Sequence, residues 1–472
     1  MQTLLNFHIN SCFSEKDDQS LNDLSPEILR ARMNILNQHK YMSRLCVGCG
    51  MCQGICPTSS INFKISEGVI TVDFDYSRCT QCGVCIRACP ALYNLYREKP
   101  EVSDVLGRIE KIYFGYSTDN SIRYHAASGG VITSLVLYML EQRIVDKVLV
   151  TKMDGFTAEP ILTGSRNQVL SAQGSIYFKT FSLRIFKRIL SDLKEGKRIC
   201  VVGLPCQISA LKKMLEDHQD KLYFLGLICN HTNEFWYLAH TVEKYLPRNA
   251  KPLAIGSRKN GWPGEIKVSF KLHSNLGEIA IPYLKFWGIL PMLNISSPLG
   301  CLLCPDHLAN SADIVTADAW HPKFAGKDSS GTSIIIARKP RGLKLIEEAV
   351  EDAVLYTEEA SLQDLLIASP GLHLIESIHY APLRRKLFQN RIEVLRELNE
   401  IDKYVVLLLT ILIMYLLKYR IARQLIVTSR IEKIFILIQW LLSRKKYGKL
   451  SQISKNLDLN RRKSIDMMGN QE

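Results

Sequence analysis

Two runs of cysteine constrain this chain more than any other feature of its sequence. Each run has the spacing C-x2-C-x2-C-x3-C and is followed by proline. Three thiolates at this spacing can bind three irons of one [4Fe–4S] cluster, whereas the fourth cysteine ligates the other cluster in two-cluster proteins of this type. We therefore expect the two runs to exchange ligands. One cluster is expected on Cys46, Cys49, Cys52 and Cys89, and the other on Cys79, Cys82, Cys85 and Cys56.

A structural zinc site is the alternative interpretation of such a motif. Zinc sites use two separated C-x2-C pairs, not runs of four cysteines that end in C-P, so the iron–sulfur interpretation is favoured. Between the runs, apolar residues alternate from Ile61 to Ile65 and again from Ile70 to Phe74. This alternation predicts a hairpin that completes a small ferredoxin-type module.

Length and composition bound the rest of the molecule. A chain of 472 residues with 47% apolar side chains predicts two or more domains. Because no signal-peptide pattern occupies the first residues and cluster ligands must stay reduced, we expect a cytoplasmic protein. The expected domains are 1–40, an N-terminal helical extension; 41–97, the ferredoxin-type domain; 98–395, the core domain; and 396–472, a basic helical tail.

The net charge of +14 is concentrated in the tail. Residues 403–472 carry fourteen Lys or Arg against four Asp or Glu, a net +10. The apolar run 404–417 is shorter than the roughly 20 residues that a membrane-spanning helix needs, and the stretch 421–442 is amphipathic. We therefore expect peripheral binding to an anionic membrane surface on its inner face. The alternative is a helical hairpin packed on the body or on a partner; the long aliphatic runs argue against nucleic acid.

Hydrophobic periodicity predicts an α/β core between the module and the tail. Short apolar runs bounded by turn residues predict strands, and a 3.6-residue period predicts helices. The predicted strands are 112–116, 147–151, 198–202 and 223–228, and the predicted helices are 130–142, 183–193 and 208–215.

Four further cysteines are dispersed in this core. Cys206 follows a strand and a Gly-Leu-Pro turn at the start of a helix, where the helix dipole favours thiolate. Cys229 ends a strand, and Cys301 and Cys304 form a C-x2-C pair. The count suits a third [4Fe–4S] cluster or a zinc site equally well, and Cys206 could also be a redox nucleophile. Cys200, inside an apolar strand, is expected to be a core residue.

Several segments of the core occur in an order typical of one known family. They are ASGGVIT at 127–133, QGSIY at 173–177, VGLPCQ at 202–207, ICN at 228–230, GCLLC at 300–304 and ADIVTADAW at 312–320. In these segments the chain resembles the beta subunit of coenzyme F-420 hydrogenases and dehydrogenases. That family includes 7-hydroxymethyl chlorophyll a reductases and bacterial relatives associated with surface polysaccharide synthesis. The resemblance covers residues 110–340 and the ferredoxin module.

The resemblance implies that the core binds FAD and a proximal [4Fe–4S] cluster. The cluster would have Cys206, Cys229, Cys301 and Cys304 as its ligands, which gives three clusters in all. The implied flavin contacts come from two segments: Ser128, Gly129, Gly130 and Thr133, and Gln173, Gly174, Ser175, Tyr177 and Lys179. A Gly pair before a helix can present amides to a diphosphate, although an ordinary strand-to-helix turn has the same pattern. No G-x-G-x-x-G follows a strand, so direct nicotinamide binding is not indicated.

Three residues near these segments are weaker candidates. His125 could face the flavin or the substrate and is the one catalytic candidate, although a lone histidine is more often structural. Asp318 and Trp320 either line the site or pack in the core.

The expected fold is thus an α/β (α+β) flavin and iron–sulfur core, preceded by a bacterial-type dicluster ferredoxin module and followed by a basic helical tail. Clusters pass single electrons and FAD exchanges two as hydride. We expect an oxidoreductase that takes electrons from ferredoxin or another redox protein and reduces an organic substrate, either a deazaflavin or a cell-envelope or polysaccharide-related intermediate. The alternative is an electron-transfer adaptor subunit without its own substrate that links a partner enzyme to the membrane. Bound flavin distinguishes the two.

Overall fold

We analysed a computed structural model of the chain, which describes residues 26–66, 68–95, 102–287, 291, 294, 296–368 and 382. The predicted basic tail, 396–472, lies outside the described residues, as does Cys12. Within the described part of the chain, no helix is long and apolar enough to cross a membrane.

The N-terminal part folds as the small module that the cysteine runs predict. Its elements are α1 (Pro26–Arg44), α2 (Met51–Ile55), β1 (Ile61–Ser66), β2 (Val69–Phe74), α3 (Val84–Arg87) and α4 (Pro90–Leu95). The predicted hairpin is confirmed, with Ile61 paired to Phe74 and Ser66 to Val69. Met42 and Leu45, near the end of α1, are buried with residues of the hairpin, so this helix is part of the module's core.

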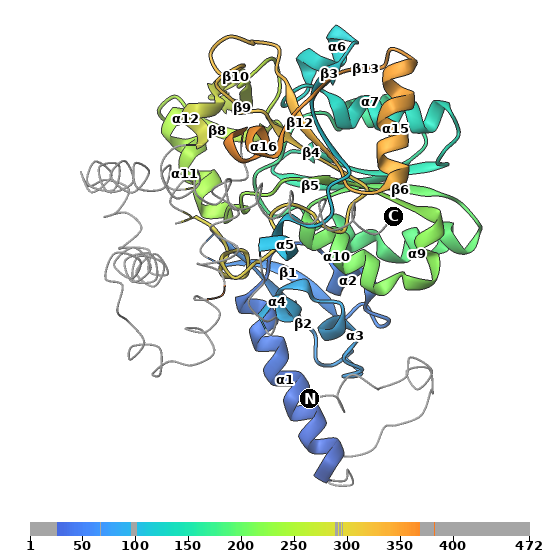
Figure 1. The fold of residues 1–472 in the computed structure, drawn as a ribbon. Coiled ribbons are helices and arrows are strands. Elements are labelled where there is room, and N and C mark those ends of the chain that lie inside the picture. Colours follow the sequence, from blue (N-terminus) through green and yellow to red (C-terminus); the bar gives the residue numbers. More distant parts are fainter. Residues whose placement is uncertain are drawn as a thin grey trace, which may run out of the picture.

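An eight-stranded sheet forms the centre of the larger part, which confirms the predicted mixed α/β fold (Figure 1). Its strands, in spatial order, are β13 (Leu355–Glu359), β3 (Lys111–Ser117), β12 (Ser333–Ala337), β11 (Ile314–Asp318), β7 (Leu222–Leu227), β6 (Ile199–Gly203), β4 (Lys147–Asp154) and β5 (Thr157–Thr163). The four central strands β11, β7, β6 and β4 are parallel, and the remaining neighbours pair antiparallel. The carboxyl ends of the parallel strands therefore meet at one edge of the sheet.

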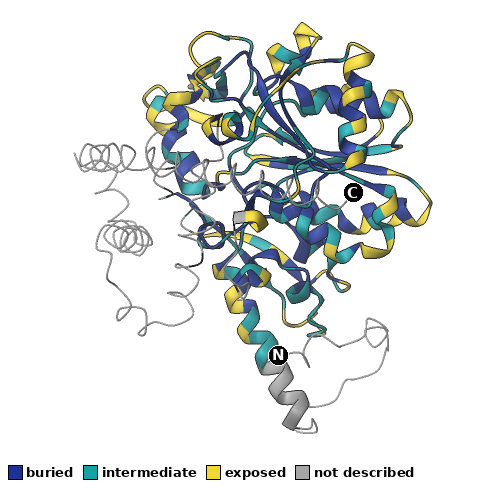
Figure 2. Ribbon diagram, viewed as in Figure 1, coloured by how far each residue is buried: buried dark blue, intermediate teal, exposed yellow. Residues whose placement is uncertain are grey.

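Helices cover both faces of this sheet (Figure 1). One face packs on α7 (Val131–Glu141) and α15 (Pro340–Glu351), and the other packs on α9 (Phe186–Lys194) and α10 (Pro205–Met214). Successive strand residues alternate between the two faces, as a pleated strand requires. Figure 2 shows the buried sheet between helices whose outer sides are exposed. Cys200 is fully buried in β6, as its apolar strand predicts.

A second, three-stranded antiparallel sheet flanks the first. It consists of β8 (Lys251–Ile255), β9 (Glu265–Leu272) and β10 (Asn275–Pro282), with α11 (Phe235–Tyr245) and α12 (Tyr283–Trp287) beside it. The remaining helical segments are α5 (Val102–Leu106), α6 (Asn120–His125), α8 (Arg166–Ser171), η4 (Ser182–Ile185), η5 (Glu216–Lys221), α14 (Leu299–Leu302) and α16 (Leu362–Ala368).

The module and the core are joined by direct backbone contacts. Phe181 N donates to Gly48 O at 2.8 Å, and Leu183 N donates to Cys49 O at 2.9 Å. A β carbon at Gly54, in α2, would lie 2.2 Å from Leu183 O, which is closer than real side chains approach a carbonyl. The first cysteine run is therefore held directly against the core.

Candidate redox site

We divide the eight cysteines of the two runs into two groups according to the predicted ligand exchange. The inner cysteine group is Cys46, Cys49, Cys52 and Cys89, and the outer cysteine group is Cys56, Cys79, Cys82 and Cys85. Burial raises the pKa of Cys49, and the next largest effect comes from the charge on Cys89 of the other run. The pKa of Cys85 is likewise raised by burial, then by Cys82, Cys79 and Cys56. For Cys49 and Cys85, the thiols with charge effects thus come from both runs. The ligand exchange itself stays a prediction.

Burial disfavours the negatively charged thiolate form of these cysteines unless a cation lies beside it. It raises the pKa of Cys89 to about 11 and the pKa of Cys52 well above the usual range, and neighbouring thiolates raise them further. Thiols of this kind stay protonated at neutral pH unless a cation replaces the proton, and coordinated metal does so outright. In the described residues no group of three or more His, Cys, Asp or Glu side chains is arranged for a single metal ion. A [4Fe–4S] cluster instead distributes its four thiolates over four irons.

The four dispersed cysteines converge on one place, which we call the core cysteine group: Cys206, Cys229, Cys301 and Cys304. Cys206 begins α10 after strand β6, and Cys229 follows the neighbouring parallel strand β7, so both lie at the carboxyl edge of the sheet. Cys301 is in α14, and Cys304 follows it closely. Burial raises the pKa of both Cys229 and Cys301 to about 12, with neighbouring thiolates adding to the effect.

We call the three cysteine groups a row, because charge effects connect the outer group with the inner group and the inner group with the core group. After burial, the charge on Cys49 of the inner group has the largest effect on the pKa of Cys206, ahead of the other three core cysteines. Cys52 of the inner group is likewise affected by Cys85 of the outer group. Asn94 of the module also donates from Nδ2 to the Sγ of Cys304 at 3.8 Å. The order is therefore outer, inner and core.

A cavity of about 1060 Å³ adjoins the core cysteine group. Its walls include the carboxyl ends of the four parallel strands, at Thr151, Gly203, Leu227 and Asp318, and they also include Cys229. Open α/β sheets bind ligands in the crevice outside the carboxyl ends of their parallel strands. The volume is at the upper limit of the roughly 300 to 1,000 Å³ that small-molecule and cofactor sites occupy.

Most of the residues that the resemblance implies for flavin line this cavity. They are Ser128, Gly130, Thr133, Gln173, Gly174, Ser175 and Tyr177. Asp318 and Trp320, which sequence alone leaves undecided, line it as well. The segments 127–133 and 173–177, which precede β4 and follow β5 in the chain, are thus brought together at the cavity.

Gly129, Lys179 and His125 do not line the cavity. A β carbon at Gly129 would lie 2.6 Å from Gly115 O, so this residue packs against β3. The Lys179 side chain is 2% exposed, and its Nζ donates to Ile70 O at 2.8 Å and to Glu234 at 2.9 Å, which ties the hairpin to the core. His125 is exposed, and its Nδ1 lies 2.9 Å from Ser121 O.

Sequence reasoning misses Arg258, which contacts residues that line the cavity. It is 1% exposed, and it pairs with Asp318 at 2.8 Å and donates to the Tyr177 hydroxyl at 2.6 Å. It also donates to Ala127 O, and its guanidinium stacks 4.2 Å from the Tyr283 ring centre. Arg258 therefore binds together four segments that converge on the cavity. No motif around it in the sequence signals this role.

Aromatic side chains surround this end of the cavity. Tyr177 lies 5.4 Å from Tyr283 and 5.0 Å from Trp287 between ring centres, and Trp320 is stacked 6.4 Å from Tyr283. All four line the cavity. Such a wall offers flat apolar surfaces to a planar ring.

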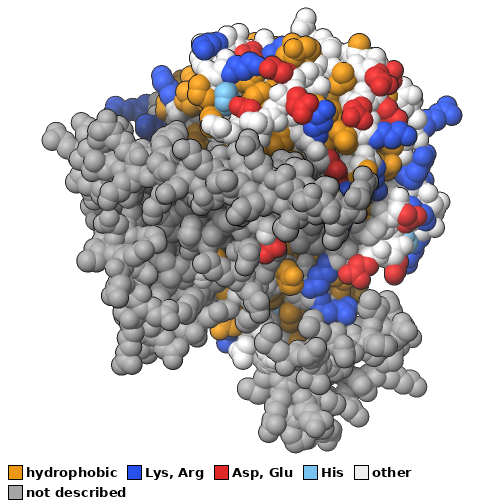
Figure 3. Space-filling model, viewed as in Figure 1, with side chains coloured by type: hydrophobic (Ala, Val, Ile, Leu, Met, Phe, Trp, Pro, Cys, Tyr) orange, Lys and Arg blue, Asp and Glu red, His pale blue; other side chains and the backbone are white. Residues whose placement is uncertain are grey.

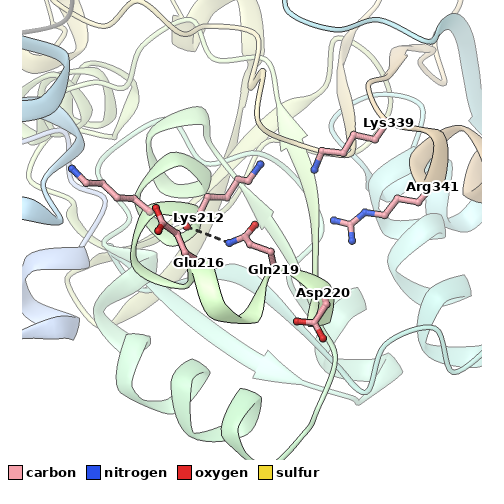
Figure 4. A pocket seen from close by; sticks show the side chains of 7 residues that line it. Lys212, Glu216, Gln219, Asp220, Lys339 and Arg341 are labelled. Atoms are coloured by element: carbon pink, nitrogen blue, oxygen red, sulfur yellow. Dashed lines mark hydrogen bonds between the residues drawn. The ribbon is translucent and has the colours of Figure 1, made fainter. Parts of the chain in front are cut away.

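A second hollow, of about 620 Å³, shares no lining residue with the cavity. It is formed by Lys212, Lys213, Glu216, Gln219, Asp220, Lys339 and Arg341 (Figure 4). Lys339 and Arg341 both pair with the buried carboxylate of Asp313 at 2.7 Å, so they compensate a buried charge. Where described residues are visible in Figure 3, basic and acidic side chains are interspersed.

Three family models match the chain. Residues 112–186 match the N-terminal model of the coenzyme F420 hydrogenase/dehydrogenase beta subunit, and residues 196–363 match the C-terminal model of that subunit. The chain belongs to this family. Residues 45–92 match a 4Fe–4S dicluster domain, which confirms the iron–sulfur character of the module. The two beta-subunit matches cover most of the residues that line the cavity.

Similar proteins include three that are named for coenzyme F420. The coenzyme F420 hydrogenase subunit beta of Methanococcus voltae is 26% identical over 56% of this chain and 87% of its own length. The F420-dependent formate dehydrogenase subunit beta of Methanocaldococcus jannaschii is 23% identical, over 52% of this chain and 61% of that protein. The coenzyme F420-dependent sulfite reductase of the same organism is 24% identical, over 76% of this chain and 52% of that protein.

A solved structure is similar to part of the chain. A chain of the F420-reducing [NiFe] hydrogenase complex from Methanosarcina barkeri is 23% identical, and the match covers 61% of this chain and 92% of that one. The TM-score is 0.43, which does not by itself establish a common fold.

Proposed function

We propose that this protein is an iron–sulfur flavoprotein oxidoreductase. It would pass electrons from a one-electron donor such as ferredoxin, through three [4Fe–4S] clusters and FAD, to an organic substrate. The observation that carries the proposal is the position of Cys229, which belongs to the core cysteine group and also lines the cavity. When bound, the clusters would carry single electrons and the flavin would exchange two as hydride.

The row of cysteine groups supports a transfer path between a redox protein and the cavity. The outer cysteine group includes Cys79 and Cys82, which are only partly buried, so a redox protein can approach it. The inner group is held against the core by the backbone contacts of Gly48 and Cys49. Cys229 of the core group then lines the cavity. Each group has the four buried or partly buried thiols that a cluster requires.

The start of α7 supports a flavin diphosphate in the cavity. Val131, Ile132 and Thr133 form the first turn of this eleven-residue helix, and all three line the cavity. The first amide groups of a helix have no acceptor within the helix, and such helix ends bind phosphate groups. Gly130, just before them, has a φ of +78°, a conformation that other residues rarely adopt. The Ser128 to Thr133 segment would therefore hold the diphosphate.

The substrate would meet the flavin at the aromatic end of the cavity. Tyr177, Tyr283 and Trp320 provide flat surfaces there, and Arg258 fixes the first of them through its hydroxyl group. A deazaflavin is supported by the names of the relatives, and a cell-envelope or polysaccharide-related intermediate is supported by the basic tail. Both are organic substrates that a hydride from flavin can reduce.

Electron delivery to flavin tests the proposal. The wild-type protein, purified anaerobically, is mixed with a reduced ferredoxin, and the flavin absorbance is followed with time. We expect the bound flavin to bleach in the wild type. In Cys206→Ser, we expect the flavin to stay oxidised. Protein that contains no flavin and gains none on incubation with FAD would contradict the proposal.

The second candidate function is an electron-transfer adaptor subunit without its own substrate. It is favoured by the relatives that are named as subunits of a hydrogenase and of a formate dehydrogenase. An adaptor needs only the clusters, so bound flavin decides between the two functions.

We also propose that the tail binds the inner, cytoplasmic face of an anionic membrane. Its net +10 and its two apolar stretches support this. The intact protein is expected to sediment with anionic vesicles at low salt and to be partly released at high salt, because screening removes only the electrostatic part. Protein lacking residues 403–472 should lose vesicle binding and keep its clusters. Intact protein that ignores such vesicles would contradict the assignment.

A further inference from the structure

His39 lies beside the outer cysteine group, on a helix that precedes both cysteine runs. The face of α1 that meets the module includes Ile35, His39 and Met42, at the spacing of successive helical turns. His39 is 1% exposed, and its Nε2 lies 3.5 Å from the Sγ of Cys85. The helix therefore brings a polar ring to a thiol that the proposed function assigns to a cluster.

The orientation of the ring is fixed by stacking. His39 and Phe74 are parallel within 8°, with ring centres 3.9 Å apart, and the Tyr76 ring centre lies 6.0 Å from that of His39. The ring cannot tilt without losing this contact. Nε2 is thus held toward Cys85 by the packing of α1 on β2.

The chemistry of the two partners determines which atom donates. An iron-bound thiolate has no proton to give, so it can only accept a hydrogen bond. An imidazole always carries a proton on at least one of its two ring nitrogens. In the described residues, Nδ1 of His39 has no hydrogen-bond partner, whereas Nε2 faces the Cys85 sulfur, so the N–H that can donate belongs on Nε2.

We propose that His39 donates a hydrogen bond from Nε2 to the Cys85 thiolate and thereby raises the reduction potential of the cluster on the outer cysteine group. Hydrogen bonds to cluster sulfurs are a main determinant of cluster potential. One electron adds one negative charge to the cluster, and an N–H directed at its sulfur stabilises that added charge. No proton is transferred and no bond is broken. This inference rests on the proposed function, because it requires a cluster on Cys56, Cys79, Cys82 and Cys85.

The variants His39→Phe and His39→Gln test the proposal through the reduction potential. Phe keeps a ring on Phe74 and removes the N–H, whereas the Gln amide places an N–H near the position of Nε2. In a redox titration followed by EPR, His39→Phe is expected to lower the equilibrium constant for reducing this cluster about tenfold, a downward shift of about 59 mV for one electron. His39→Gln is expected to recover part of the shift.

A second measurement uses the wild-type protein alone. Pulsed EPR of the reduced protein, with histidine labelled by ¹⁵N, should detect one histidine nitrogen and one exchangeable proton coupled to the outer cluster. Both results are required. An unchanged potential in His39→Phe, or the absence of the nitrogen coupling, would overturn the inference. If the wild type contains no cluster on the outer group, the iron content reveals it and the proposed function fails instead.

Discussion

Nη1 of Arg258 lies 2.8 Å from Oδ2 of Asp318, and this ion pair closes one end of the cavity beside Tyr177 and Tyr283. Arg258 is 1% exposed and the side chain of Asp318 is 17% exposed. Residues from the β8 to β9 connection and from the end of β11 are thus held together by buried charges. The pair fixes the wall against which a bound ring would lie.

Asp318→Asn should destabilise the core because it leaves the buried Arg258 without its counter-charge. Breaking a buried ion pair from one side costs about 3 to 5 kcal/mol. The exposed pair between Lys64 and Asp73 is a suitable control, since side chains 60% and 49% exposed form ion pairs worth about 1 kcal/mol or less. We expect the apparent thermal midpoint to fall by roughly 10 °C in Asp318→Asn and by much less in Lys64→Met. Equal effects would show that the buried pair does not fix the wall.

Gly54→Ala should loosen the contact between module and core. The added methyl group would lie 2.2 Å from Leu183 O, and the carbonyl is fixed by η4. Forcing atoms into a packed contact costs about 1 to 3 kcal/mol. Gly256→Ala is the matched control, because the nearest atom to its β carbon is 3.5 Å away. Hydrogen exchange at the amides of Phe181 and Leu183 should increase in Gly54→Ala only; unchanged exchange there would contradict the contact.

Lys179→Met separates a role in flavin binding from a role in docking. Lys179 Nζ joins Ile70 O of the hairpin to Glu234 of the core, and the side chain does not line the cavity. We expect this variant to keep its flavin and to show faster exchange in β1 and β2. Lys187→Met is the control, since that exposed lysine makes only a 3.5 Å contact with Ser59 of the module. Loss of flavin with normal exchange would restore Lys179 as a flavin contact.

Ala172→Trp should exclude FAD by filling the cavity. Ala172 follows α8 and lines the cavity, whereas the adjacent Ser171 is exposed. Ser171→Trp therefore adds the same side chain to the surface. We expect flavin content to fall at least tenfold in Ala172→Trp and to stay at the wild-type level in Ser171→Trp, with iron unchanged in both. Full flavin in Ala172→Trp would mean that FAD binds elsewhere.

Local patterns in the sequence predict much of the parallel sheet. The predicted strand 147–151 lies within β4, and 198–202 differs from β6 by one residue at each end. These strands are apolar and bounded by turn residues, so their local pattern is strong. The alternation of Ile266, Val268 and Phe270 in β9 is an equally local signal, and it marks the second sheet that the motif-based analysis leaves out.

The candidate site is predicted less completely because its geometry depends on distant segments. Three of its contacts join residues from different elements of the chain. Gly129 packs against β3, Lys179 bridges the hairpin and the core, and His39 contacts Cys85. Cysteine spacing predicts which thiols can bind one cluster, because three of them lie on the same short loop. It contains no information on which side chain of another element packs against that loop.

The composition of the anaerobically purified protein tests the central claim most directly. Iron, acid-labile sulfide and flavin are quantified per chain in the wild type and in Cys206→Ser. With three [4Fe–4S] clusters and one FAD, the wild type should contain about twelve irons, about twelve sulfides and one flavin, and Cys206→Ser should retain about eight irons. A wild type with about eight irons, with zinc on the core cysteine group or with no flavin, would contradict the account.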